Sequence, residues 1–370
     1  MLIGTEHEYS INSRSLQPRA ESDRILGELS GPGSSEASCG RVTLTKELQK
    51  TVIEFVPDHP AETIRELEGM VTDGTRSFFR RFGDRYCLLG LGMHPSLCLS
   101  QTAVWDSDEQ EYYDAYDRIF GLSQHGWLNI QSLQVNLSYD GEKSMVGTFN
   151  TLRSLLPYLA AVSAASPFVE GVPSGSMDSR LLFYRENQRQ IPSICHGIVP
   201  EPLVSRAQYL SWLEEMYRAL REKGEPSLCQ EWVASYGVII RFSRPCVELK
   251  IMDEQECARS DMALCAFIRA LLRADLSFLE SDRRCLLELT EQALRRGSAP
   301  FRPELLRLLR TAERHATADE RFFLPVVKRR IEEGSLAELI MSDWKESGDL
   351  PGLMRSLASC LRTNTPYGSS

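Results

Sequence analysis

The chain opens with Met1-Leu2-Ile3-Gly4-Thr5-Glu6-His7-Glu8-Tyr9-Ser10, a stretch that carries two acidic side chains one residue apart. Side chains alternate between the two faces of a β-strand, so Glu6 and Glu8 point to the same face. We expect the other face to be packed, and it carries Ile3, Thr5, His7 and Tyr9. Two carboxylates on one strand face repel each other unless they are solvated or share a hard divalent cation. The stretch therefore predicts either a half-exposed edge strand or a strand that presents metal ligands.

The bulk composition is typical of a globular protein. The 370 residues are 42% hydrophobic and 25% charged, enough for one large domain or two closely joined halves. The net charge of −9 argues against a general polyanion-binding surface, so we expect no nucleic-acid partner. We also expect no membrane association, because no apolar run reaches the roughly 20 residues of a spanning helix. The N-terminus lacks the basic start and apolar core of a signal peptide, and the cysteines form no Cys-x-x-Cys pair, so we expect free thiols in a cytoplasmic protein.

Two further expected strands carry a carboxylate on one face. The first is Thr51–Val56, in which Glu54 lies among β-branched neighbours. A carboxylate in such surroundings is costly to bury without a partner cation. The second is Cys246–Met252, in which Glu248 and Lys250 share one face and apolar side chains share the other.

The segment 131–139 predicts a strand with an unusual polar face. Its leucines and valine alternate with uncharged polar residues that include Gln134 and Asn136. Either a solvated outer face or an inward face that lines a site would fit this alternation.

A long apolar helix is expected over 143–165, and Pro157 within it predicts a kink or a break. The helix is expected to end at Ser166-Pro167, and the turn-rich segment 168–180 that follows ends in Arg180. Turns of this kind expose backbone N–H groups that suit phosphate oxygens, and an arginine adds a bidentate donor. This loop is a weak indication of an anion site when taken alone.

The remainder of the chain predicts helices. We expect residues 1–255 to form the catalytic region and residues 256–362 to form a helical region packed on the same domain, as scaffold or as the surface of a homodimer. Residues 363–370 are expected to be a disordered tail.

Together these motifs resemble the glutamate–cysteine ligase family of the glutamine-synthetase-like superfamily, in its plant and proteobacterial branch. Three motifs in order carry the resemblance: Gly4-Thr5-Glu6-His7-Glu8, Gln134-Val135-Asn136-Leu137, and the loop from Ser166 to Pro173 with Gly175 and Arg180 after it. Val52-Ile53-Glu54-Phe55 and Val247-Glu248-Leu249-Lys250 resemble the family's other acidic strands more loosely. The resemblance implies an α+β fold, with a curved antiparallel sheet and helices packed on its outer face.

The resemblance also implies a chemistry and roles for residues. ATP would phosphorylate the γ-carboxylate of glutamate, an amine would attack the acyl phosphate, and Mg²⁺ would bridge phosphate oxygens. Metal binding is implied for Glu6, Glu8, Glu54 and, more loosely, Glu248. Contacts with the nucleotide are implied for Gln134, Asn136, Arg180 and Lys250, and Arg180 is also the implied catalytic arginine. Lys250 departs from the superfamily, which often has arginine there, and a lysine is a point donor without the guanidinium fork.

The acceptor amine stays open at this point. Cysteine is the leading candidate by resemblance, but residues 181–245 match no pattern of the family that would define its pocket. The alternatives are a γ-glutamyl ligase for a different amine, a non-catalytic nucleotide-binding regulator of the same fold, and a metal-dependent hydrolase. The absence of a His-Glu-x-x-His motif counts against the hydrolase.

Overall fold

An eight-stranded antiparallel sheet and many helices form the protein, whose computed structural model describes residues 1–368. The strand order is β2-β3-β4-β1-β6-β10-β9, with β5 also paired to β1, and all the pairings are antiparallel. The strands are β1 (Ile3–Ser13), β2 (Glu36–Cys39), β3 (Val42–Lys46), β4 (Val52–Pro57), β5 (Tyr86–Leu89), β6 (Ser132–Ser138), β9 (Val238–Arg241) and β10 (Cys246–Asp253). A separate two-stranded ribbon joins β7 (Phe168–Val169) to β8 (Val172–Pro173). The predicted α+β class and antiparallel sheet are therefore confirmed.

The opening stretch forms β1, the central strand, and it is not an edge strand. Its predicted packed face is buried, as Ile3, Thr5, His7 and Tyr9 are each at most 2% exposed. The register of β1 then sets what lies beside its polar face. Glu8 lies directly opposite Glu54 of β4, and Glu6 lies opposite Gln134 of β6. The sheet thus gathers the acidic and amide side chains on one surface.

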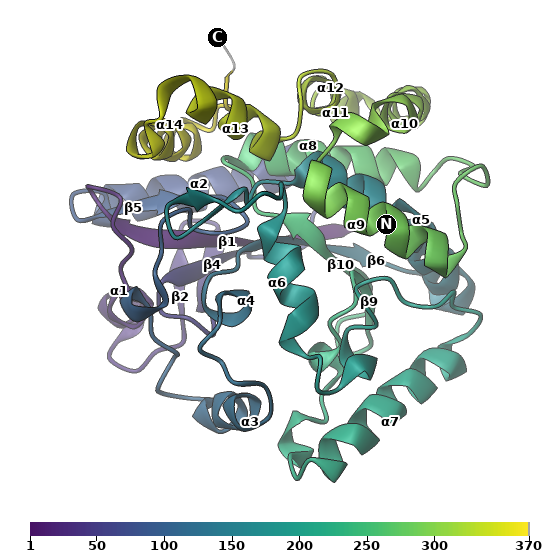
Figure 1. The fold of residues 1–370 in the computed structure, drawn as a ribbon, viewed down its shortest axis with the longest axis horizontal. Helices are drawn as coiled ribbons and strands as arrows, with labels where there is room; N and C mark the ends of the chain where they lie inside the picture. The colour runs from purple at the N-terminus through teal and green to yellow at the C-terminus, as the bar shows by residue number, and fades with distance from the viewer. Residues whose placement is uncertain (369–370) are drawn as a thin grey trace.

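Helices lie on both sides of the sheet (Figure 1). One side is covered by α2 (Ile64–Phe82), α5 (Gly141–Ser163) and α8 (Ala258–Leu271), with the C-terminal helices stacked beyond them. Those helices are α9 (Arg283–Arg296), α10 (Arg302–His315), α11 (Ala318–Arg321), α12 (Leu324–Glu332), α13 (Leu336–Ser347) and α14 (Leu350–Thr363). The other side carries α3 (Gln110–Phe120), α4 (His125–Leu128), α6 (Ser179–Asn187) and α7 (Arg206–Glu222), and α1 (Ser22–Ser30) lies near β2. The polar face of the sheet is therefore turned toward α3, α4 and α6.

One continuous apolar core runs from the packed face of the sheet into the C-terminal helices. It contains Ile3 of β1, Leu155 of α5, Phe267 of α8 and Ile331 of α12. This core therefore continues across the expected boundary at residue 255. The ten cysteines are free thiols, and no helix within residues 1–368 has the length and apolarity to cross a bilayer.

Two local expectations differ from the structure. The helix α5 continues through Pro157 without a break, because the residue is buried within tightly packed neighbours that hold the helix on both sides of it. The tail is not disordered over residues 363–368, since the side chain of Asn364 donates to Glu68 Oε1 at 2.9 Å and Tyr367 is buried. The last two expected tail residues, 369–370, lie outside the described residues.

Candidate active site

Three carboxylates converge on the polar face of the sheet. One oxygen from each of Glu8, Glu47 and Glu54 lies within 4.8 Å of the others. Glu8 and Glu54 face each other across the β1–β4 pair, and Glu47 comes directly after the end of β3. Like charges directly opposite in a sheet are destabilising, so this arrangement favours a cation or bound protons between the oxygens.

Burial and mutual repulsion raise the pKa values of these carboxylates. Burial, followed by the charges of Glu6 and Glu47, raises the pKa of Glu54 well above its usual range. Burial and the nearby Glu8 carboxylate raise the pKa of Glu47 to about 8. Burial also raises the pKa of Glu8, although hydrogen bonds from Gln134 and Ser132 oppose the rise. The cluster therefore retains protons near neutral pH that a divalent cation would displace.

Hydrogen bonds hold two of these carboxylates in place. The Ser132 backbone N–H donates to Glu8 Oε2 at 2.7 Å, and the Gln134 side-chain amide donates to Glu8 Oε1 at 2.9 Å. Thr45 Oγ1 donates to Glu54 Oε2 at 2.6 Å. Supporting contacts of this kind orient metal ligands, so the donor set fits a hard divalent cation such as Mg²⁺.

Glu6 lies beside the cluster and has partners of its own. Its Oε1 accepts hydrogen bonds from Asn136 Nδ2 and Arg244 Nη1, each at 3.1 Å. Glu6 is therefore not one of the three converging carboxylates, although it borders the same cavity. Its expected place in the cluster is taken by Glu47.

Two cations, Lys250 and Arg241, line the same cavity as the carboxylates. Lys250 Nζ and Arg241 Nη1 each lie 2.8 Å from an oxygen of Glu248, which is fully buried. Burial would raise the pKa of Glu248, but the charges of Lys250 and Arg241 lower it. Burial would lower the pKa of Lys250, but Glu248 raises it. Cations engage both oxygens of Glu248, so this carboxylate orients Lys250 and Arg241. It is poorly placed for the metal binding that the sequence led us to expect.

These groups line one cavity of about 440 Å³. The carboxylates Glu6, Glu8, Glu47 and Glu54 and the cations Lys46, Arg241, Arg244 and Lys250 border it together. Aromatic side chains enclose it from α3 and neighbouring segments: Tyr112, Tyr113, Tyr116, Trp127, Tyr184 and Trp232. A cavity with negative and positive sides under an aromatic cover can hold a cation next to a polyanion while limiting access of water.

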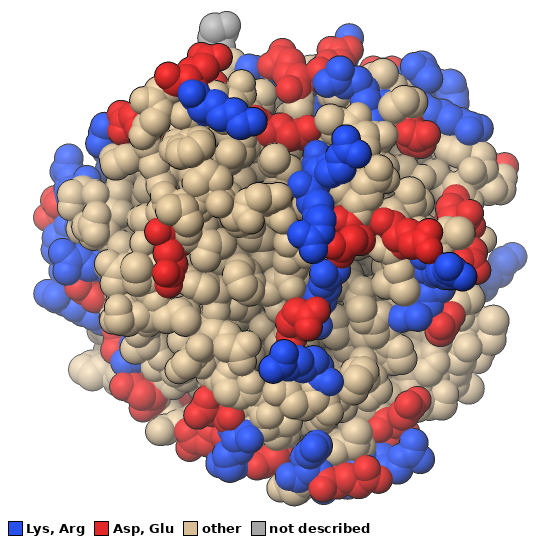
Figure 2. All heavy atoms as spheres, viewed as in Figure 1, with Lys and Arg blue, Asp and Glu red and all other residues tan. Residues whose placement is uncertain are grey.

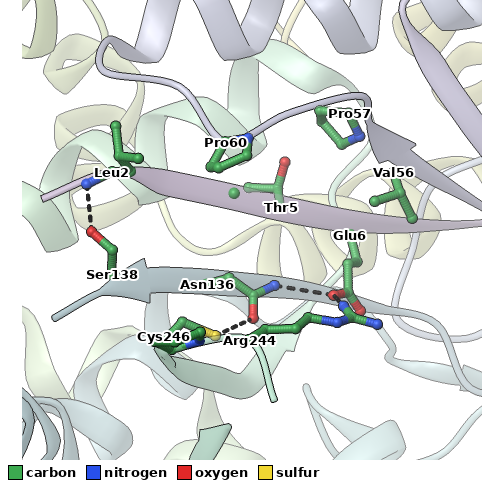
Figure 3. A pocket seen from close by; sticks show the side chains of 12 residues that line it. Leu2, Thr5, Glu6, Val56, Pro57, Pro60, Asn136, Ser138, Arg244 and Cys246 are labelled. Carbon is green, nitrogen blue, oxygen red and sulfur yellow. Dashed lines mark hydrogen bonds and ion pairs between the residues drawn. The ribbon is translucent and has the colours of Figure 1, made fainter. Parts of the chain in front are cut away.

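A second, mostly apolar cavity of about 340 Å³ adjoins the first (Figure 3). It lies over the start of β1 and the end of β6 and is lined by Leu2, Gly4, Val56, Pro57, Pro60 and Cys246, among others. The ion pair of Glu6 with Arg244 stands where the two cavities meet, because both residues line both cavities.

Arg180 is placed differently from the expectation. It is the second residue of α6, not the last residue of a loop, and its side chain is buried. Its Nε donates to Asp253 Oδ1 at 2.6 Å, and its Nη2 donates to the Ile251 carbonyl oxygen at 2.9 Å. The guanidinium thus holds α6 against the end of β10, and we assign it a positioning role instead of contact with a phosphate.

Local sequence patterns did not identify several residues of the site. Glu47, Lys46, Arg241 and Arg244 lie at or just beyond strand ends, where alternation no longer says which way a side chain points. One signal was available in the sequence: Lys46 and Glu47 are adjacent at the end of β3, the strand that precedes β4 with Glu54. The aromatic cover had no signal of its own, because its members come from separate segments of the chain.

The model of glutamate-cysteine ligase family 2 (GCS2) matches residues 2–356. The chain belongs to this family. An uncharacterised protein of Archaeoglobus fulgidus is 47% identical over 368 residues, which cover 99% of this chain and 100% of that protein. The family assignment makes the protein similar to carboxylate–amine ligases of the glutamate–cysteine ligase type.

Solved structures agree on the fold. The glutamate–cysteine ligase of Francisella tularensis in complex with AMP matches with a TM-score of 0.62 at 11% identity, over 98% of this chain and 89% of that one. The bifunctional glutathione synthetase of Pasteurella multocida matches with a TM-score of 0.65 at 13% identity, over 98% of this chain. This family member spans about half of that bifunctional chain, 52% of its length.

On the face shown in Figure 2, acidic and basic side chains are interspersed around the rim and along a line down the middle.

Proposed function

We propose that the protein is an ATP- and Mg²⁺-dependent ligase that activates the γ-carboxylate of glutamate as an acyl phosphate and joins it to an amine. The observation that carries the proposal is the single cavity in which Glu8, Glu47 and Glu54 face Lys250 and Arg241. Transfer of a phosphoryl group to a carboxylate brings together several negative charges, and such a site must neutralise them.

The metal-binding part of the proposal rests on the three converging carboxylates. Glu8, Glu47 and Glu54 would hold Mg²⁺, and Glu6 at the rim completes the acidic side of the cavity. When bound, Mg²⁺ neutralises phosphate oxygens and aligns them for in-line transfer. The raised pKa values of the cluster support this assignment, since they mark oxygens that lack a counter-ion.

The adjoining apolar cavity suits the base and ribose of the nucleotide. Its walls are aliphatic, and Asn136 and Ser138 add polar atoms at its edge (Figure 3). A nucleotide held there would pass its phosphates over Glu6 and Arg244 into the carboxylate cluster. Gln134 and Asn136 would then support the nucleotide side through the carboxylates they already hydrogen-bond.

Lys250 and Arg241 supply positive charge on the opposite side of the cavity. They would bind the anionic groups of glutamate and stabilise the charge that develops on the transferring phosphoryl group. Glu248 keeps both cations in position and charged within a buried environment.

The acceptor amine would enter the cavity past its aromatic side chains. Family membership favours cysteine, and the aromatic cover of α3 is the surface that an acceptor would meet on its way in. ADP release should therefore require glutamate and Mg-ATP and should rise when the correct amine is added.

A screen with Mg-ATP, glutamate and a panel of amines tests the proposal, with products identified by mass. We expect a γ-glutamyl product, and we expect Glu54→Gln to abolish it. The surface variant Glu28→Gln serves as a matched control, because Glu28 pairs with Arg85 away from the cavity. ATP binding without turnover for every amine would instead identify a nucleotide-binding regulator.

A further inference from the structure

We propose that His7, Glu254 and Asp261 bind a second divalent metal ion, on the face of β1 opposite to the catalytic cavity. Their ligand atoms lie within 4.8 Å of one another, and all three side chains are fully buried. They come from three elements: His7 from β1, Glu254 from the residue after β10, and Asp261 from α8. This site goes beyond the proposed ligase activity and does not depend on it.

The distances suit ligands that share one ion. His7 Nδ1 lies 3.2 Å from Glu254 Oε1 and 3.5 Å from Asp261 Oδ2. Metal–ligand bonds of about 2.0–2.2 Å in a tetrahedral or octahedral arrangement place neighbouring ligand atoms roughly 3.0–3.6 Å apart. The three atoms therefore need little rearrangement to receive a cation.

The second polar atom of each side chain is anchored elsewhere. Glu254 Oε2 accepts the Glu8 backbone N–H at 3.3 Å, and Asp261 Oδ1 accepts the Gln255 backbone N–H at 3.1 Å. His7 Nε2 lies 2.9 Å from Thr5 Oγ1. When an ion displaces the proton of Nδ1, Nε2 can keep its own proton and donate to Thr5, and the lone pair of Nδ1 then faces the ion. Outer partners of this kind orient the ligands of metal sites.

Two observations indicate room for a cation in the cluster. Asp261 Oδ2 accepts no hydrogen bond, and its ion-pair partner is His7 Nδ1 at 3.5 Å. Within residues 1–368, the ion pairs of Glu254 and Asp261 involve His7 and include no lysine or arginine. Against the effect of burial, Glu254 and Asp261 raise the pKa of His7 to about 10, so the imidazolium supplies the positive charge between the carboxylates when no metal is bound. A divalent ion would replace the protons held by these three groups.

The donor set indicates the class of ion. One imidazole nitrogen and two carboxylate oxygens suit Zn²⁺, Mn²⁺ or Fe²⁺, whereas Mg²⁺ prefers oxygen ligands and retains several waters. An ion here would tie β1 to β10 and α8 directly behind Glu6 and Glu8. It would thereby hold the strand that presents the catalytic carboxylates.

Metal analysis of the whole protein tests the proposal. After dialysis against EDTA, which should remove Mg²⁺ from the open cavity, we expect about one equivalent of zinc, manganese or iron per chain to remain. Less than about 0.1 equivalent, both in the protein as isolated and after incubation with each ion, would overturn the proposal and indicate that the three groups share protons instead.

Variants separate the two faces of β1. His7→Asn and Asp261→Asn should lose the retained ion, whereas Glu54→Gln, altered only on the cavity side, should keep it. Loss of the ion from Glu54→Gln with retention in the other two would assign it to the cavity and refute the site. If the buried variants do not fold, Co²⁺ loading of the unaltered protein and of Glu54→Gln decides. Both should show the same saturable visible absorption, and its absence from both would refute the site.

Discussion

Glu54→Gln should make the metal-free protein more stable while removing its response to Mg²⁺. The oxygens of Glu8, Glu47 and Glu54 lie within 4.8 Å, and two unit charges at that distance repel by about 3.5 kcal/mol at an effective dielectric constant of about 20. Only a fraction of this repulsion operates, because Glu47, with a pKa raised to about 8, and Glu54, with a pKa raised well above its usual range, both retain protons near neutral pH. We therefore expect the free energy of unfolding to rise by about 1–2 kcal/mol at pH 7.5. Glutamine can still accept the hydrogen bond from Thr45, so little is lost in exchange.

Urea unfolding and thermal melting with and without Mg²⁺ measure both effects. The unaltered protein should be stabilised by Mg²⁺, and Glu54→Gln should bind the ion at least about tenfold more weakly, in line with the loss of a supporting ligand. Glu28→Gln should leave the Mg²⁺ response unchanged, since it removes a surface carboxylate only. A Glu54→Gln variant that is less stable without metal, or that responds normally to Mg²⁺, would show that these carboxylates do not form the metal site.

Three further outcomes follow from the same geometry. Glu248→Gln should lower the free energy of unfolding by about 3–5 kcal/mol in urea, because Lys250 and Arg241 lose a buried counter-charge; a change below about 1 kcal/mol would contradict that pairing. Arg180→Lys should lower the free energy of unfolding by about 2–3 kcal/mol, while KM for ATP stays within about twofold. A large rise in KM with normal stability would instead show that Arg180 contacts the substrate, as the sequence led us to expect. The pKa of Glu47 is about 8 in the folded chain against 4.5 for a free glutamate, so the folded state holds a proton that the unfolded chain has lost. The stability of the metal-free protein should therefore fall as pH rises from about 4.5 to 8 and should level off above that, and Glu47→Gln should flatten this slope in melts across the range.

The sequence alone was sufficient where a local rule decides the outcome. Alternation along a strand separated Glu6 and Glu8 from the packed residues of β1, and the structure buries the latter as expected. The same rule correctly placed strands around Glu54, Gln134 and Glu248. Side-chain period is a property of the extended backbone, so it needs no knowledge of distant parts of the chain.

Tertiary structure decided which charges meet. Glu47 joined the cluster because β3 pairs with β4, and Arg241 reaches Glu248 because β9 pairs with β10. Lys250 lies two residues from Glu248 on the same strand face, so this one pair follows from alternation. Arg180 turned to Asp253, which lies 73 residues further along the chain. Coulomb interactions and hydrogen bonds depend on distances in space, and these were set by strand register and helix packing that no local pattern encodes. The sequence therefore determined which strand faces carry charge, and only the fold determined the ion pairs between distant segments of the chain.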